Sequence, residues 1–302
     1  MRMKRKRGVF FISMTIVIIS LFLATYTIYS SVKERKVVQK RVETMNNFIS
    51  SMEQDIPRKM FIAGFRSIFV FNNKIVETGL YVNNVSARLE EMFYNGTFLG
   101  EPQTIMNGAK FSDVQNDLSI QGNKINVDVS ITNASIKIDQ TDPWNVRVTL
   151  ISNFSINDTN NLASWDKTLV SSGFIPIYHF EDPFYLLNTG GIISNKINQT
   201  PYQTFDSQTL LNHTQMQYYI NTTDAPSFID RLEGKTSSST YGIESLVYIP
   251  DLSNAGLPIY QRSIVDYIYF SQLNNASCHV SGQPSWFYLD SARLARYGAA
   301  CG

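Results

Sequence analysis

The first 60 residues divide into two parts that differ in the pattern of their apolar positions. Residues 9–29 are dominated by Val, Ile, Leu and Phe, and no charged residue occurs between Gly8 and Val32. A helix of this length extends roughly 31 Å, which matches the hydrocarbon layer of a bilayer. We therefore predict one transmembrane helix over 9–29. Because no other apolar segment reaches spanning length, we expect the remaining residues to lie on one side of the membrane.

The apolar positions that follow the span are periodic rather than continuous. Six of them recur at steps of three or four residues: Val38, Val42, Met45, Ile49, Met52 and Ile56. This spacing predicts an amphipathic helical stalk over 30–75, which we expect Pro57 to interrupt. The apolar stripe needs a partner, either the chain's own sheet or a second copy in a coiled coil.

Alternating apolar and polar residues predict an antiparallel sheet head within 76–180, after two short helices at 85–94 and 111–118. A change of parity at 132–134 predicts a bulge or a bend in the first strand. The expected strands cover residues 125–138, 146–156 and 168–177. The predicted fold class is therefore α+β, with the long N-terminal helix packed on the sheet.

Residues 181–302 have a less regular pattern, which predicts a second α+β lobe or an elaboration of the head. Expected helices cover 227–232 and 289–297, and expected strands cover 243–249 and 265–270. The change to an irregular pattern after residues 179–183 places a boundary near residue 180, although no linker of low complexity marks it.

The charge distribution adds an orientation to this scheme. Five basic residues lie within 1–8, the predicted leader or cytoplasmic tail, and a second basic group diluted by Glu34 follows the span. The positive-inside rule favours a cytoplasmic N-terminus and an extracellular C-terminal domain. The formal net charge of +1 argues against a nucleic-acid partner. The apolar segment is longer than the core of a cleaved secretory signal, which favours an uncleaved anchor.

Sequons and cysteines also suit an exterior location. Asn-x-Ser/Thr occurs nine times after the span, although an Asn-, Ser- and Thr-rich surface also generates such triplets without glycosylation. The candidate glycosylation sites are Asn84, Asn95, Asn133, Asn153, Asn157, Asn198, Asn212, Asn221 and Asn275. The two cysteines, Cys278 and Cys301, predict either one disulfide or two inert thiols.

Candidate chemistry is sparse. His179, with Glu181 and Asp182, is the best local cluster for a metal, but a loop with a turn-forming Asp-Pro is the simpler interpretation. Cys278 and His279 are adjacent, so they would point to opposite faces of a strand. The chain contains no catalytic or nucleotide-binding motif that we recognise. We expect no enzyme activity, no cofactor and no metal, and the small-molecule ligand, if any, is unknown.

The N-terminal pattern resembles that of archaeal type IV pilin-like proteins. The basic leader ending in Gly8, followed by Val9 and the apolar helix, is similar to their class III signal peptide. The resemblance covers residues 1–60 and implies cleavage between Gly8 and Val9, with subunits bundled through their apolar helices. Where many pilins have Glu five residues after the cut, this chain has Ser13, which suits a minor or pseudopilin-type subunit better.

Two functions follow from these patterns. The first is a pilin-like cell-envelope subunit that acts in filament assembly or surface contact, with itself or with other pilin-like subunits as partners. The alternative is an unprocessed single-pass extracellular binding or sensor-like protein whose stalk self-associates.

Overall fold

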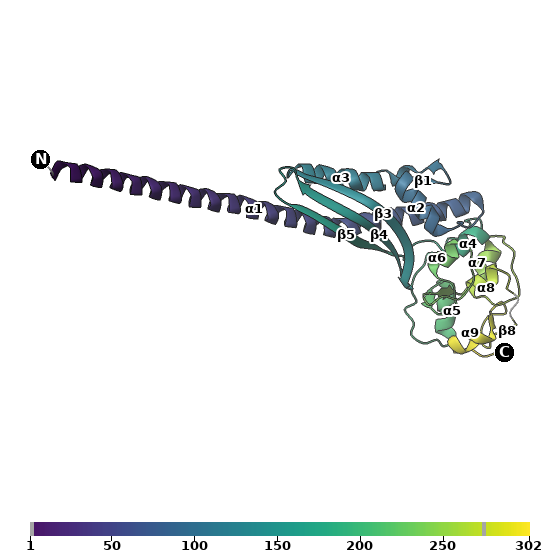
Figure 1. Ribbon diagram of the computed structural model, residues 1–302. Helices are drawn as coiled ribbons and strands as arrows, with labels where there is room; N and C mark the ends of the chain where they lie inside the picture. The colour runs from purple at the N-terminus through teal and green to yellow at the C-terminus, as the bar shows by residue number, and fades with distance from the viewer. Residues whose placement is uncertain (1–2, 274–275) are drawn as a thin grey trace. The chain divides into compact units, whose positions relative to one another are not determined.

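The computed structural model describes residues 3–273 and 276–302 (Figure 1). Helix α1, Met3–Thr78, packs against an antiparallel sheet whose strand order is β3-β4-β5. The three strands cover Val127–Asp142, Asn145–Asp158 and Ser164–Pro176. Smaller helices and strands follow toward the C-terminus. This arrangement confirms the predicted α+β fold class.

Helix α1 continues without a break through Pro57, so the predicted interruption is wrong. Proline removes one backbone hydrogen bond from a helix interior and normally kinks or ends it. Here Ile56 and Met60, on either side of Pro57, are fully buried. Burial of the flanking apolar side chains offsets the lost hydrogen bond, and the helix therefore continues to Thr78.

The sheet follows the predicted alternation. Every second residue of β4 from Val146 to Asp158 is buried, and the residues between them are exposed or half-buried. In β3 the parity changes around Asn133, whose φ of 50° lies in the left-handed region. Asn tolerates this conformation better than most residues, which explains the predicted irregularity at 132–134.

The chain forms two compact units, of which the first comprises Met1–Gln54, Leu118–Ser130 and Phe154–Lys167. Within this unit nearly every described side chain from residue 10 to 40 is exposed, and burial begins at Met45. Among the described side chains of α1, Arg41 is the first to form a hydrogen bond with the sheet region, since its guanidinium donates to Asp158 Oδ1 and to the carbonyl oxygen of Asn126 just before β3. The structured part of this unit therefore begins about eleven turns into α1.

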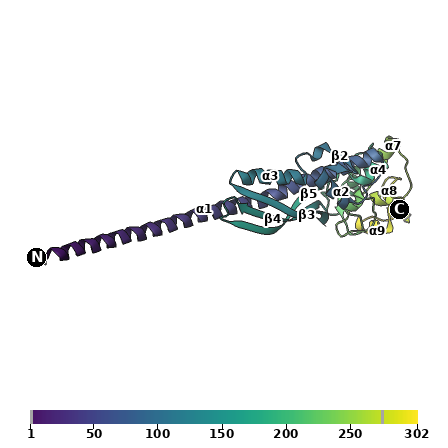
Figure 2. The same cartoon turned by 45° about the horizontal axis from the view of Figure 1, so that its top comes forward.

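The second unit comprises Asp55–Asp117, Ile131–Asn153 and Thr168–Gly302. Helix α2, Val85–Asn95, confirms the first short helix, and α3, Phe111–Asn123, is longer than predicted. Short strands β1, Thr97–Phe98, and β2, Glu101–Pro102, pair between these helices, followed by the 3-10 turn η1, Thr104–Met106. Figure 2 shows α3 alongside α1, where Lys59 Nζ lies 2.6 Å from Asp117 Oδ2.

Strand β5 approaches α1 most closely at Gly173. A Cβ built on this glycine would lie 2.3 Å from the backbone nitrogen of Phe61 and 2.8 Å from the carbonyl oxygen of Pro57. Those distances are shorter than any van der Waals contact allows, so only glycine fits between strand and helix here.

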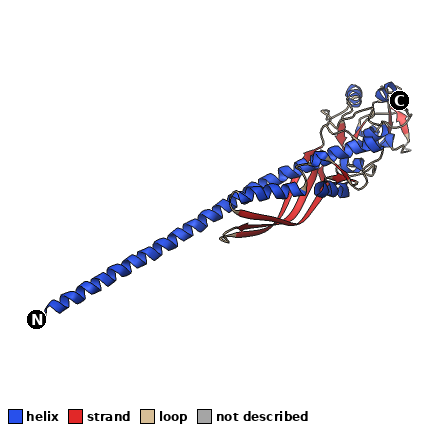
Figure 3. Ribbon diagram, turned by 90° about the horizontal axis from the view of Figure 1, so that it is seen from above, coloured by secondary structure: helices blue, strands red, loops and turns tan. Residues whose placement is uncertain are grey.

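Residues 183–302 form short helices and two-stranded ribbons joined by loops (Figure 3). Strand β6 pairs with β7, and β8 pairs with β9, both antiparallel. The helices are α4 Pro183–Asn188, α5 Ser207–Gln215, α6 Phe228–Leu232, α7 Ile249–Asn254, α8 Asp266–Phe270 and α9 Ser291–Arg296. The strands are β6 Tyr219–Asn221, β7 Ile243–Ser245, β8 Ser277–His279 and β9 Tyr288–Asp290.

Two sequence predictions in this region need correction. Residues 265–270, predicted as a strand, form helix α8, and the strand predicted over 243–249 ends at Ser245. Residues 263–269 are buried on every side. An apolar run without a polar face has no period that distinguishes a strand from a short helix.

Candidate functional site

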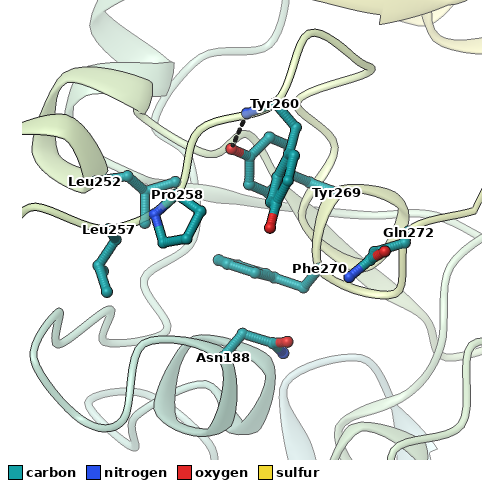
Figure 4. Close-up of a pocket in the computed structure, with 8 residues that line it drawn as sticks. All are labelled: Asn188, Leu252, Leu257, Pro258, Tyr260, Tyr269, Phe270 and Gln272. Carbon is teal, nitrogen blue, oxygen red and sulfur yellow. Dashed lines mark hydrogen bonds between the residues drawn. The ribbon is translucent and has the colours of Figure 1, made fainter.

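A small hollow between α4, α7 and α8 is a candidate binding site, and we call it the aromatic slot (Figure 4). Its cavity volume is about 90 Å³. The lining residues are Asn188, Leu252, Leu257, Pro258, Tyr260, Tyr269, Phe270 and Gln272. The rings of Tyr269 and Phe270 meet edge to face with centroids 5.5 Å apart.

Backbone caps place these side chains. Helix α7 ends where Gly256 adopts a φ of 71° and Leu257 N donates to Leu252 O, which turns Pro258 toward the slot. Helix α8 then supplies Tyr269, whose hydroxyl accepts a 3.0 Å hydrogen bond from Tyr260 N (Figure 4). Burial raises the pKa of the Tyr269 hydroxyl, which keeps it protonated.

The chemistry of the slot is neutral. Among the residues that the structure describes, none with a charged side chain lines it, while the amides of Asn188 and Gln272 and the hydroxyl of Tyr260 supply polar groups. Such a lining suits an uncharged, partly apolar group held by ring contacts and a few hydrogen bonds. It provides no general base or nucleophile.

The cluster predicted around His179 is divided by the fold. His179 lies in a turn with a φ of 67°, and with Glu181 it faces a hollow of about 260 Å³ beside Phe69 and Asn72. Glu181 Oε1 accepts a hydrogen bond from Ser194 Oγ at 2.8 Å. Across residues 3–273 and 276–302, no group of three or more His, Cys, Asp or Glu side chains is placed to hold a metal.

Asp182 instead joins a buried ion network that the sequence did not indicate. Arg231 Nη1 lies 2.6 Å from Asp182 Oδ2 and 2.8 Å from Asp266 Oδ2, and all three side chains are inaccessible to solvent. Tyr219 Oη donates to Asp182 Oδ2 at 2.8 Å, and Ser245 Oγ donates to Asp266 Oδ2 at 2.9 Å. The network joins α4, α6, α8, β6 and β7.

One arginine serves two carboxylates here, so backbone donors must compensate for the extra negative charge. Phe184 N donates to Asp182, and Tyr267 N donates to Asp266. Burial and the neighbouring Asp266 raise the pKa of Asp182, against the lowering effect of Arg231. Burial opposes the charge of Arg231, but both carboxylates outweigh it and raise its pKa. Both carboxylates are paired, and within this network only Arg231 Nε lacks a hydrogen-bond partner among the described residues, which indicates a structural role.

A second network fixes the C-terminal helix. Glu244 on β7 is buried and lies 3.0 Å from Arg296 Nη1 and 3.5 Å from Arg293 Nε. Tyr297 Oη donates to Glu244 Oε1 at 3.2 Å. Burial raises the pKa of Glu244, although both arginines act in the opposite direction. These contacts anchor α9 to β7.

The two cysteines form the predicted disulfide, with Cα atoms 5.7 Å apart. It closes the C-terminal tail onto β8, where Gly302 N donates to His279 O at 2.9 Å. The ring of His279 bonds the carbonyl oxygens of Gln283 and Pro284. Cys278 therefore has no free thiol, and a Cys-His nucleophile is excluded.

The third histidine, His213, is buried on α5. Its Nδ1 lies 3.1 Å from Thr200 Oγ1, and its Nε2 has no hydrogen-bond partner among the described residues. The rings of Phe205 and Tyr297 lie 5.0 and 5.8 Å away. Burial lowers the pKa of His213 to about 4, so the ring is neutral at physiological pH.

Most candidate glycosylation sites are accessible. Asn84 N-caps α2 through its oxygen, which leaves its amide nitrogen at the surface. Exposed sequon asparagines are Asn84, Asn95, Asn133, Asn153, Asn157 and Asn221, whereas Asn198 and Asn212 are half-buried. Asn275 lies outside the described residues.

The candidate processing site lies near the start of α1. Gly8 and Val9 are both within the helix, and the side chains of residues 3–9 lie outside the described part of the structure. The most apolar window of this helix has a mean hydropathy of 2.1, and none of it is buried. By length and composition, α1 can cross a membrane. Comparison with protein-family models, curated proteins and solved structures finds no match to the chain.

Proposed function

We propose that the protein is a pilin-like subunit of the cell envelope, of the minor or pseudopilin type. Its apolar helix anchors it in the membrane, and its sheet head acts outside the cell in filament assembly or surface contact. The observation that supports this proposal most strongly is that α1 has two parts. Its apolar N-terminal part is exposed, and its C-terminal part is packed against the head. An apolar helix without contacts needs lipid or neighbouring helices around it.

The outward orientation is part of this proposal. The disulfide between Cys278 and Cys301 supports an oxidising compartment, since disulfides rarely persist in the cytoplasm. The accessible sequons are compatible with glycosylation there. No enzymatic step enters the proposal.

The experiment that tests the pilin-like assignment is intact mass analysis and N-terminal sequencing of the protein extracted from native membranes. A chain that begins at Val9 is the expected result, because the leader ends at Gly8. A chain that retains Met1 rejects processing and leaves the membrane anchor in place.

A second candidate function is an unprocessed, single-pass binding protein. The aromatic slot favours it, because the slot offers rings and uncharged polar groups without catalytic chemistry. In this case Tyr260→Ala and Phe270→Ala should abolish ligand-induced thermal stabilisation. A panel of neutral sugars and aromatic amides is the appropriate first screen.

A stalk that self-associates would have limited apolar surface for the purpose. Within the first unit, Met45 and Met52 of the predicted stripe are already buried, which leaves Val38 exposed and Val42 and Ile49 half-buried. One exposed and two half-buried apolar positions are fewer than a coiled coil needs. Crosslinking of the full chain in membranes, with Val38→Asn as the variant, tests this alternative.

A further inference from the structure

Helix α1 carries a line of lysines directly after its apolar segment. Lys33, Lys36 and Lys40 share one shallow hollow with Tyr29. At about 100° per residue these four positions fall within an arc of roughly 60° on the helix surface. We call Lys33, Lys36 and Lys40 the lysine face.

The head does not use this face. The apolar stripe that contains Met45 and Met52 lies roughly 150° or more around the helix from the lysine face, and both methionines are buried. Arg41, which points away from the lysine face by about 100°, bonds Asp158 and Asn126. In the described part of the chain, no acidic side chain forms an ion pair with any of the three lysines.

The position of the lysine face along the helix indicates its partner. Tyr26 and Tyr29 end the apolar segment, as aromatic residues do at membrane interfaces. The three lysines follow Tyr29 by about 6, 10 and 16 Å of helix rise. A headgroup layer is roughly 5–8 Å thick on each side, and lysine side chains reach several ångströms along a helix. The ammonium groups of Lys33 and Lys36 can therefore reach the depth of lipid phosphates, and that of Lys40 lies just above this layer.

We propose that the lysine face binds the phosphate groups of anionic lipids in the leaflet from which α1 emerges. This inference rests on the proposed membrane span, but it holds for either orientation because it depends only on the adjacent leaflet. Three cations on one side of the helix would gather anionic lipid on that side.

The test uses the full chain reconstituted in vesicles of phosphatidylcholine alone or with phosphatidylglycerol. Flotation reports insertion, and mass spectrometry after mild extraction reports the lipids that remain bound. We expect phosphatidylglycerol to be enriched at least about fivefold over its share of the vesicle. The variant K33Q/K36Q/K40Q should lose this enrichment and still float.

A matched control removes the same charge elsewhere. K124Q/K137Q/K196Q alters three lysines that are exposed in the head and form no ion pair in the described structure. This control should keep the enrichment. Equal enrichment in both variants overturns the proposal, as does its loss when free glycerol phosphate is added, because the site would then bind soluble phosphate. Failure to float in either vesicle rejects the span as well, whereas flotation without enrichment rejects the lysine face alone.

Discussion

Arg41 on α1 donates through Nε to Oδ1 of Asp158 at the end of β4, across 117 residues of sequence. The side chain of Asp158 is inaccessible, and its other oxygen accepts from the backbone nitrogens of Asn160 and Leu162 at 3.1 Å. One carboxylate therefore closes the β4-β5 turn and holds it against the helix. It marks the point at which the helix acquires tertiary contacts.

Replacing Arg41 with Ala should loosen this end of the sheet, because a carboxylate that solvent does not reach loses its charged partner. Hydrogen–deuterium exchange should rise in residues 154–167. Arg147→Ala provides the control, since its pair with Asp139 is exposed and should give no measurable change. Unchanged exchange in R41A would show that the ion pair holds nothing in place.

From the carboxylate of Asp158 we also predict that the stability of the fold depends on pH in the acid range. Burial acts against its charge, but hydrogen bonds from Leu162 and Arg41 outweigh it and lower the pKa of Asp158. A lowered pKa contributes stability above the unfolded value near 4, which is lost as the pH falls through the folded value. The Asp158→Asn variant should lose the part of the acid transition that wild type shows in this range. An identical transition in both proteins would contradict the assignment.

Gly173→Val should destabilise the fold, because the new side chain would overlap the backbone of α1 at Phe61. Overpacking of this kind costs about 1–3 kcal/mol and more where backbone must move. Val170→Ala, on the opposite and exposed face of β5, is the control and should have little effect. Urea unfolding of the detergent-solubilised chain measures the stability of both variants. Equal unfolding midpoints would contradict the prediction and would show that α1 shifts at little cost to admit the larger side chain.

Arg231→Met should be among the most damaging substitutions. It leaves Asp182 and Asp266 buried without a counter-ion, and breaking a buried pair in this way costs about 3–5 kcal/mol. R231M/D182N/D266N removes the charges together and should recover part of that loss. If the triple variant is no more stable than R231M, charge burial is not the cause.

His213 predicts a pH dependence in another range. Its pKa of about 4 lies below the ordinary value of 6.5, so unfolding takes up a proton between these values. Stability should therefore fall as the pH drops from 6.5 to 4, by about 3 kcal/mol in full. His213→Phe should flatten this slope. A slope that survives the substitution must arise from other groups.

In the N-terminal half, the helix and the strands could be predicted from the regular spacing of apolar residues. The stripe from Val38 to Ile56 identified the face of α1 that the head covers, and alternation identified all three long strands. The interruption predicted at Pro57 was wrong because the burial of Ile56 and Met60 outweighed the low helix propensity of proline. Residues 263–269 are all buried, so no period remained to separate helix α8 from a strand.

The candidate site was harder to predict than the fold. The aromatic slot combines residues 188 to 272, which come together only through caps and loops. The Arg231 network likewise joins carboxylates 49 and 35 residues away. One signal was available: the sequence Asp182-Pro183 marks a helix start, and the Asp182 side chain does cap α4. The pairing of Asp182 with Arg231 could not be predicted, because the two residues are 49 positions apart and belong to no local motif.

The most direct test of the central claim is the side of the membrane on which the head lies. Lys124→Cys places a thiol at an exposed position beside the end of α3, while the native cysteines are held in their disulfide. A membrane-impermeant maleimide applied to intact cells should label this variant, and the labelled protein should remain in the carbonate-washed membrane fraction. Labelling only after the cells are lysed, or release from washed membranes, would contradict a membrane-anchored head outside the cell.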